Sequence, residues 1–104
     1  MTELPHGEQL NIHVACRLGN LGLIVQLVEA DPTCVNSRDA KLHWTPLFRC
    51  VVSRNFQAIE YLLSKGADPN IANENNETPL HQAADNAQLD IARLLLRHSA
   101  SPNI

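Results

Sequence analysis

Apolar residues recur along this chain at intervals of three and four positions, the period of an amphipathic α-helix rather than of a β-strand. Two short apolar stripes follow each other, and this happens three times. The first stripe of each pair consists of Ile12, Ala15 and Cys16; Leu47, Cys50 and Val51; and Leu80, Ala83 and Ala84. The second consists of Ile24, Leu27 and Val28; Ile59, Leu62 and Leu63; and Ile91, Leu94, Leu95 and Leu96. The pattern predicts three pairs of short helices, and the last helix runs from about Leu89 to His98.

The three pairs belong to an internal repeat. The segment that begins TPLFRC at Thr45 recurs as TPLHQA at Thr78, and both copies close on Ala, Pro, Asn and Ile. A more degenerate copy begins at Leu10 and is two residues longer than the copy at Thr45. The two additional residues fall in or near residues 31–44, which we expect to form a loop. The sequence therefore predicts repeats at about 10–44, 45–77 and 78–104, after a flexible N-terminal segment at 1–9.

Helix starts are encoded at the beginning of the second and third copies. Thr78 is expected to be an N-cap, because its hydroxyl oxygen can accept a bond from an otherwise unpaired backbone N–H. Pro79 then suits the first helical position, where a missing N–H costs nothing. Thr45 and Pro46 repeat this pair.

Helix ends and turns are marked by residues that tolerate a left-handed backbone. Gly66 follows a helical segment at the position where such a residue closes the helix. Asp31 and Ser99 hold the matching positions of the other copies, so we expect those ends to fray more. Asn76 falls in a polar segment where a turn requires positive φ. The segments between copies should therefore be projecting turns.

The residues at these positions resemble the ankyrin repeat family. The 33-residue period and the pattern T-P-L-H-x-A are its signature. Residues 78–83 match the pattern fully, and residues 45–50 match with Phe48 for His and Cys50 for Ala. The stretch GADPN that begins at Gly66 is similar to the family's closing motif. In the first copy His13 and Ala15 remain, although Leu10 and Asn11 replace Thr and Pro.

This resemblance implies an all-α fold, an α-solenoid of stacked helix–turn–helix repeats with projecting β-turn or hairpin loops. Members of the family typically bind other proteins with the tips of these finger-like loops and with the concave helix surface. The resemblance also implies a structural role for His81 and for His13, whose rings should bond near the Thr of the motif and to neighbouring backbone. Asp85 lies four residues after His81, but no Ser or Cys nucleophile accompanies the pair, so we expect no catalytic site.

Other chemistry finds little support in the sequence. The histidines and the three cysteines are scattered over different repeats, so no metal or cofactor site is expected. Cys16 and Cys50 stand where the family has Ala and should be buried, whereas Cys34 falls in the longer loop and should be more exposed. An odd cysteine number without a CxxC pair favours reduced thiols and an intracellular setting, cytoplasmic or nuclear.

Composition and charge narrow the partners. Apolar residues make up 44% of the 104 residues and aromatics only 4%, which favours packed helices. The net charge is -3 and the pI about 5.9, so no basic surplus supports binding to nucleic acid or to an anionic membrane. The expected partner is a protein.

Candidate partner-binding residues lie at the variable positions of the resembled family. They are Arg38, Asp39, Lys41, His43 and Trp44 in the first finger; Glu74, Asn75 and Glu77 in the second; and Val52, Ser53, Asp85 and Asn86 on the inner helices. Trp44 allows two interpretations. An exposed Trp at a loop tip would be an interface anchor, or its ring could fold back and pack on the longer loop.

The predicted function is that of a non-enzymatic protein-interaction module. The alternative is a regulatory or targeting arm of a larger enzyme such as a ubiquitin ligase subunit, a kinase or a channel. Leu94, Leu95 and Leu96 follow one another in the last helix and would leave apolar surface where a fourth repeat would stack. We therefore expect the chain to be the N-terminal part of a longer array, and self-association through this leucine-rich face is the other way to cover it.

Overall fold

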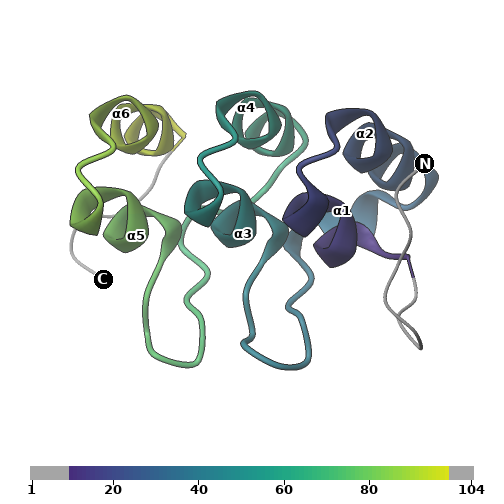
Figure 1. Ribbon diagram of the computed structural model, residues 1–104, viewed down its shortest axis with the longest axis horizontal. Helices are drawn as coiled ribbons and strands as arrows, with labels where there is room; N and C mark the ends of the chain where they lie inside the picture. Colours follow the sequence, from purple (N-terminus) through teal and green to yellow (C-terminus); the bar gives the residue numbers. More distant parts are fainter. Residues whose placement is uncertain (1–9, 99–104) are drawn as a thin grey trace.

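The computed structural model describes residues 10–98, and this part of the chain contains α-helices and one 3-10 helix but no β-strand. The elements are α1 (Ile12–Leu18), α2 (Leu21–Ala30), η1 (Pro32–Asn36), α3 (Pro46–Val52), α4 (Phe56–Ser64), α5 (Pro79–Asp85) and α6 (Leu89–Arg97). Helices α1, α3 and α5 form one row, and α2, α4 and α6 form a second row above it (Figure 1). The predicted all-α solenoid is therefore confirmed. The expected flexible segment at 1–9, Ser99 and the end of the third repeat lie outside the described residues.

The inner-row helices α1, α3 and α5 begin where polar side chains cap them. The Thr45 hydroxyl oxygen accepts a hydrogen bond from the Phe48 N–H at 3.2 Å, and that of Thr78 accepts one from the His81 N–H at 3.3 Å. Pro46 and Pro79 take the first helical position, as predicted. The first repeat differs, because Asn11 is the N-cap of α1 and accepts from the Val14 N–H at 3.0 Å. Helix α1 therefore begins one position later in its repeat than α3 and α5.

The predicted turn geometry holds at two positions and fails at one. Gly66 has φ 92° and Asn76 has φ 61°, both in the left-handed region. Asp31, in contrast, has φ −149°, so the expectation that it takes the left-handed place of Gly66 is wrong, whereas the expected fraying of this helix end stays a prediction. Its carboxylate instead accepts a bond from the Thr33 N–H at 3.1 Å. Asp31 thereby ends α2 and caps η1 at once, and it needs no left-handed conformation.

The segment expected to be a loop after α2 starts as the helix η1. Pro32 occupies the first turn of η1, and the side chain of Val35 in the same helix is buried. The two additional residues of the first repeat are divided between two places. Asp39 follows Asp31 by 8 residues in the first repeat, whereas Asn73 follows Gly66 by 7 in the second. Trp44 then follows Asp39 by 5 residues, whereas Glu77 follows Asn73 by 4. One residue is therefore added near η1 and the other in the loop that follows.

The core lies between the two helix rows and between neighbouring pairs. Most of the predicted apolar stripe is buried, with Leu47, Ile59 and Leu62 fully enclosed. The prediction is wrong for Leu96, which is 47% exposed, and for Ala84, which is also exposed. Leu27 and Leu80 are only half-buried. These residues belong to the first and last described helix pairs, which have a neighbouring pair on one side only.

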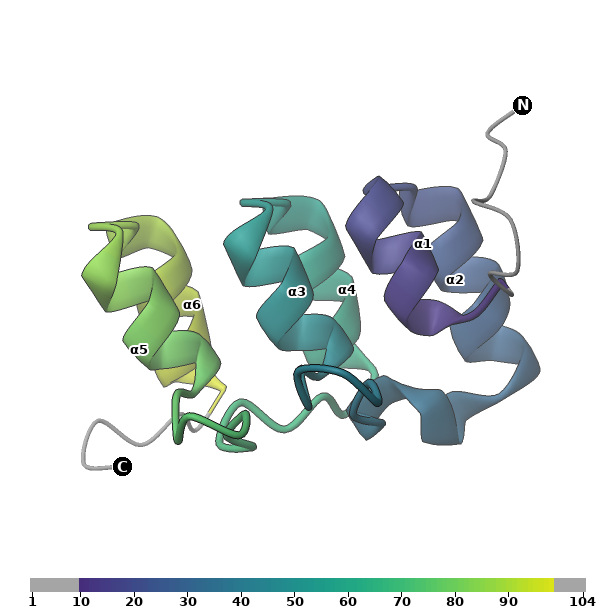
Figure 2. The same ribbon diagram turned by 60° about the horizontal axis from the view of Figure 1, so that its bottom comes forward.

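Two loops project from the inner row on the same side of the solenoid (Figure 1). We call residues 37–45 finger 1 and residues 70–78 finger 2. Finger 1 leads into α3 and finger 2 into α5, so each finger ends at the capping threonine of an inner helix. Figure 2 shows the two fingers beside each other beneath the starts of these helices. The fold therefore holds the two fingers in a fixed order along the stack.

Candidate protein-interaction surface

Each finger is closed by one short polar side chain. In finger 2 the Asn73 N–H donates to the Glu77 carbonyl at 2.9 Å, and the Asn73 side-chain oxygen accepts from the N–H groups of Asn75 at 2.8 Å and Glu77 at 3.0 Å. In finger 1 the Asp39 N–H donates to the Trp44 carbonyl at 3.0 Å, and its Oδ1 accepts from the N–H groups of Leu42 at 2.8 Å and Trp44 at 3.3 Å. Both fingers are therefore built before any partner binds.

Asp39 keeps its negative charge while it holds the finger. Its side chain is only 18% exposed, and burial by itself would raise the pKa of this carboxyl group. The backbone N–H groups of Leu42 and Trp44 donate to the carboxylate and outweigh this, so the pKa of Asp39 lies below its ordinary value. The Arg49 guanidinium adds an ion pair at 3.9 Å. Asp39 is thus a charged residue of the finger base, and its charge is offset by Arg49.

Trp44 lies against α3 of the following repeat rather than at the tip of the finger. Its ring packs on Phe48 with a centroid distance of 4.9 Å and an interplanar angle of 50°. The Arg49 guanidinium carbon lies 4.1 Å from the centre of the Trp44 ring, within cation–π range. The ring is half-buried. Of the two interpretations of Trp44, the structure excludes an exposed tip residue. The ring does pack, but on Phe48 and Arg49 of α3 rather than on the longer loop.

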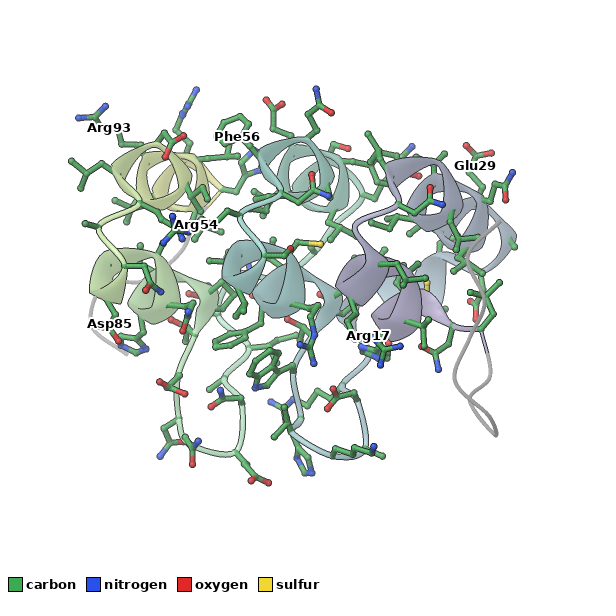
Figure 3. The ribbon with its side chains drawn as sticks, viewed as in Figure 1. Arg17, Glu29, Arg54, Phe56, Asp85 and Arg93 are labelled. Atoms are coloured by element: carbon green, nitrogen blue, oxygen red, sulfur yellow. The ribbon has the colours of Figure 1, made fainter. Side chains whose placement is uncertain are left out.

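The other predicted partner-binding residues are placed as follows. Arg38, Lys41, His43, Ser53, Glu74, Asn75, Asp85 and Asn86 are exposed, and Val52 and Glu77 are half-buried. The finger residues come together in the two adjacent loops. Val52 and Ser53 lie at the end of α3, and Asp85 and Asn86 at the end of α5, so these four belong to the helix ends opposite the fingers. Figure 3 shows Arg17 and Asp85 on the same inner row, at α1 and α5. Contact of these residues with a partner remains a prediction.

The sequence reasoning missed the roles of two residues of this surface. Arg49 stacks on Trp44 and pairs with Asp39, and nothing in its local sequence indicates that it reaches back to the finger. Asn73 is 7% exposed and holds finger 2. Its alignment with Asp39 in the first repeat is the signal that could have indicated its role, since Asn and Asp both bond the backbone in turns.

His81 has the structural role that the sequence predicted. Its Nδ1 accepts a hydrogen bond from the Thr78 N–H at 3.0 Å and lies 3.2 Å from the Thr78 hydroxyl oxygen. Together with the bond from the His81 N–H to Thr78, this forms a reciprocal capping box. The ring thus ties finger 2 to the start of α5 and is committed to structure.

His13 bonds differently, and the expectation that it repeats the arrangement of His81 is wrong. Its Nε2 lies 3.1 Å from the Ser37 hydroxyl oxygen, which donates its own proton to the Cys34 carbonyl at 2.8 Å. The His13 Nε2–H is therefore the donor to Ser37. The Nδ1 atom is buried and has no hydrogen-bond partner within residues 10–98. The cause is the shifted N-cap, because Asn11 and not a Thr caps α1.

We expect His13 to make stability depend on pH. Burial lowers the pKa of His13, Asp39 opposes this effect and Arg49 adds to it. His13 therefore takes up a proton more readily in the unfolded chain than in the folded one. The contribution of neutral His13 to stability is fully present above about pH 6.5 and is lost as the pH falls through the lower pKa of His13 in the folded state. The second repeat has Phe48 at the position equivalent to His13. The variant His13→Phe should therefore remove the loss of stability that His13 causes between about pH 7.5 and 5.5. Urea unfolding at both pH values measures it, and an unchanged difference in the variant would contradict the assignment.

The cysteines offer no activated nucleophile. Cys16 and Cys50 are buried, as predicted, and Cys34 is half-buried on η1 with its Sγ 3.9 Å from the Leu27 carbonyl oxygen. A hydrogen bond with the Cys50 thiol, followed by burial, raises the pKa of the Cys16 thiol, and burial raises that of Cys34. The part of the chain that the structure describes holds no group of three or more His, Cys, Asp or Glu side chains suited to a metal ion. None of its helices is long and apolar enough to cross a bilayer.

Paired short helices, stacked side by side with preformed loops along one edge, define an α-solenoid interaction domain. A family model described as ankyrin repeats, in three copies, matches residues 12–104. The chain belongs to the ankyrin repeat family, whose fold is a non-catalytic protein-interaction module.

Similar proteins carry such repeats in different settings. The chain is 36% identical over 58 residues to a putative ankyrin repeat protein L92 of Acanthamoeba polyphaga mimivirus, covering 56% of this chain and 14% of that protein. It is 37% identical over 73 residues to a transient receptor potential cation channel subfamily A member 1 homolog of Caenorhabditis elegans, covering 70% and 6%. It is 31% identical over 94 residues to the palmitoyltransferase AKR1 of Kluyveromyces lactis, covering 88% and 12%. The chain thus spans only a small part of the length of these relatives.

Proposed function

We propose that this chain is a non-enzymatic module that binds a protein partner through its two fingers and the exposed side of α1, α3 and α5. The observation that carries the proposal is the closure of both fingers by Asp39 and Asn73. A surface that is already ordered loses little conformational entropy on binding, so its contacts contribute more fully to affinity. The half-buried Trp44, which contacts Phe48 and Arg49, supplies a partly exposed aromatic side chain at the base of finger 1.

A pull-down from cell lysate tests this proposal. The finger variant combines Trp44→Ala with Glu74→Ala, and the control combines Glu29→Ala with Glu60→Ala on the outer helices α2 and α4, where both residues are exposed. Circular dichroism checks that all forms are folded. We expect proteins captured by the wild type to be lost with the finger variant, by about tenfold or more, and retained with the control. Equal capture by the finger variant and the wild type would reject the finger surface.

A second candidate is that this module is the regulatory or targeting arm of a larger protein such as a ubiquitin ligase subunit, a kinase or a channel. The support is that two similar proteins are named as a cation channel and a palmitoyltransferase, of which this chain matches 6% and 12%. Sequencing the complete transcript tests this candidate. A catalytic or channel-forming segment in the same reading frame would favour it, and a frame with repeats alone would reject it.

We further propose that the module acts as the N-terminal part of a longer repeat array. The support is a difference in exposure between equivalent apolar residues of the second and third repeats. Leu63 and Val51 are 5% and 0% exposed, whereas their equivalents in the last described helix pair, Leu96 and Ala84, are exposed. Joining a second copy of residues 45–77 behind the third repeat should raise the melting temperature. A dimer of the original chain, lost in Leu96→Glu, would instead assign this leucine-rich face to self-association.

The intracellular location, cytoplasmic or nuclear, also remains a proposal. It is supported by the usual setting of ankyrin repeats and by three cysteines without a disulfide. Microscopy of the tagged full-length protein tests it, and secretion into the medium would reject it.

A further inference from the structure

The charges of the inner helix row change sign along the stack of repeats. Arg17, Val52 and Asp85 occupy equivalent positions, because each is the eighth residue of its repeat. The same position is therefore positive in the first repeat, neutral in the second and negative in the third. Arg17 and Asp85 are both exposed, and Figure 3 shows them at opposite ends of the inner helix row.

The fingers repeat this order. Lys41 in finger 1 and Glu74 in finger 2 are equivalent, because each lies four positions before the capping threonine, and both are exposed. Finger 1 also exposes Arg38, and the charge of its Asp39 is offset by Arg49 at 3.9 Å. Finger 2 adds Glu77, which is half-buried and accepts a bond from the Asn73 side chain at 3.1 Å. Finger 1 is therefore the basic finger and finger 2 the acidic one.

An aromatic contact lies between these charges. Trp44 closes finger 1 on the side of α3 and packs on Phe48, which is 2% exposed. We call the two fingers together with the exposed side of α1, α3 and α5 the finger side. Along the stack it presents basic side chains first, then the aromatic contact of Trp44, and then acidic side chains. Opposite charges facing such a line fix the direction and register of a partner more than they add affinity.

We propose that the finger side binds an extended segment of a partner protein that carries acidic side chains at one end and basic side chains at the other. The acidic end lies on finger 1 and the basic end on finger 2. The long dimension of the molecule is 39 Å, so a segment of at most about 12 extended residues fits along it. This inference rests on the proposed function and adds the chemistry of the partner segment to it.

Fluorescence anisotropy with labelled peptides of about 12 residues tests the inference. One peptide has a Glu block, a Gly/Ser spacer and a Lys block, a second has Glu at both ends and a third has Lys at both ends. We expect the wild type to bind the two-signed peptide about tenfold more tightly than either other peptide at low salt, with the difference lost at about 0.5 M salt. The net charge of -3 would by itself favour the all-Lys peptide, so net charge cannot produce this order.

Charge-reversal variants sharpen the test. Arg38→Glu with Lys41→Glu makes both fingers acidic and should shift the preference to the all-Lys peptide. Glu74→Lys with Asp85→Lys should shift it to the all-Glu peptide. The variant with all four changes should return to the two-signed peptide, which then binds in the opposite direction. Glu29→Lys with Glu60→Lys on the outer helices should leave the order unchanged.

Several results would overturn the inference. Preference of the wild type for a single-signed peptide, equal binding of all three, or binding of none would each do so. A salt-dependent dimer lost in Arg38→Glu with Lys41→Glu would assign the surface to a second copy of the chain instead. Failure here differs from failure of the proposed function, because loss of captured proteins with Trp44→Ala and Glu74→Ala would still place a partner on the fingers.

Discussion

Leu63→Ala is expected to lower the free energy of unfolding by about 3 kcal/mol, whereas Leu96→Ala should lower it by less than about 1 kcal/mol. The two leucines are equivalent residues of the second and third repeats. Leu63 is 5% exposed, so its removal leaves a cavity that the neighbouring helices cannot fill completely. Leu96 is 47% exposed, so its replacement by alanine removes mainly side-chain atoms that contact solvent.

Urea unfolding followed by circular dichroism gives both values, and similar slopes with urea would show that the same surface unfolds in each variant. The comparison is matched, because residue type, helix position and substitution are the same. Equal losses at the two positions would contradict the account. Leu96 would then be covered to the same degree as Leu63.

Thr78→Ala should destabilise the chain by about 1.5 kcal/mol. The side chain is 1% exposed, and its hydroxyl oxygen accepts from the His81 N–H at the first turn of α5. Alanine cannot replace this bond, and it also removes the hydroxyl that contacts the His81 ring at 3.2 Å. Helix α5 and the end of finger 2 should both loosen.

Thr78→Ser is the matched control, because serine keeps the hydroxyl group and loses only a methyl group. It should cost less than about half as much as the alanine variant. Thermal melts of the three forms, with amide exchange at residues 80–82, measure the two effects. A serine variant as unstable as the alanine variant would mean that packing of the methyl group, and not the cap, holds this helix start.

Much of the fold could be predicted because each repeat carries its own local signals. The recurring apolar stripes, the Thr-Pro starts and Gly66 each depend on neighbouring residues, and the helix pairs follow from them. The three consecutive leucines indicate an uncovered apolar face on the last helix, but the local pattern does not tell which of them is exposed, nor that Ala84 is. Burial of these residues depends on which element lies next to them, and the apolar pattern within one helix is the same at an internal and at a terminal repeat.

The surface was harder to predict than the fold, for a physical reason. The position of Trp44 is decided by Arg49 and Phe48, which reach it from the following helix, and no local pattern encodes such a contact. His13 likewise departs from His81 because Asn11 shifts the start of α1 by one residue. Asp31 was misjudged because alignment with Gly66 assumes the same backbone, whereas its carboxylate starts a new helix. Long-range packing and cap changes therefore account for these errors.

The central claim is that a partner protein binds the finger side of the solenoid. Hydrogen–deuterium exchange, comparing the free chain with the chain bound to a captured partner, tests this claim most directly. The account predicts slower exchange on binding in residues 37–45 and 70–78 and in α1, α3 and α5, with little change in α2 and α4. Slower exchange confined to the outer helices, with both fingers unchanged, would contradict it.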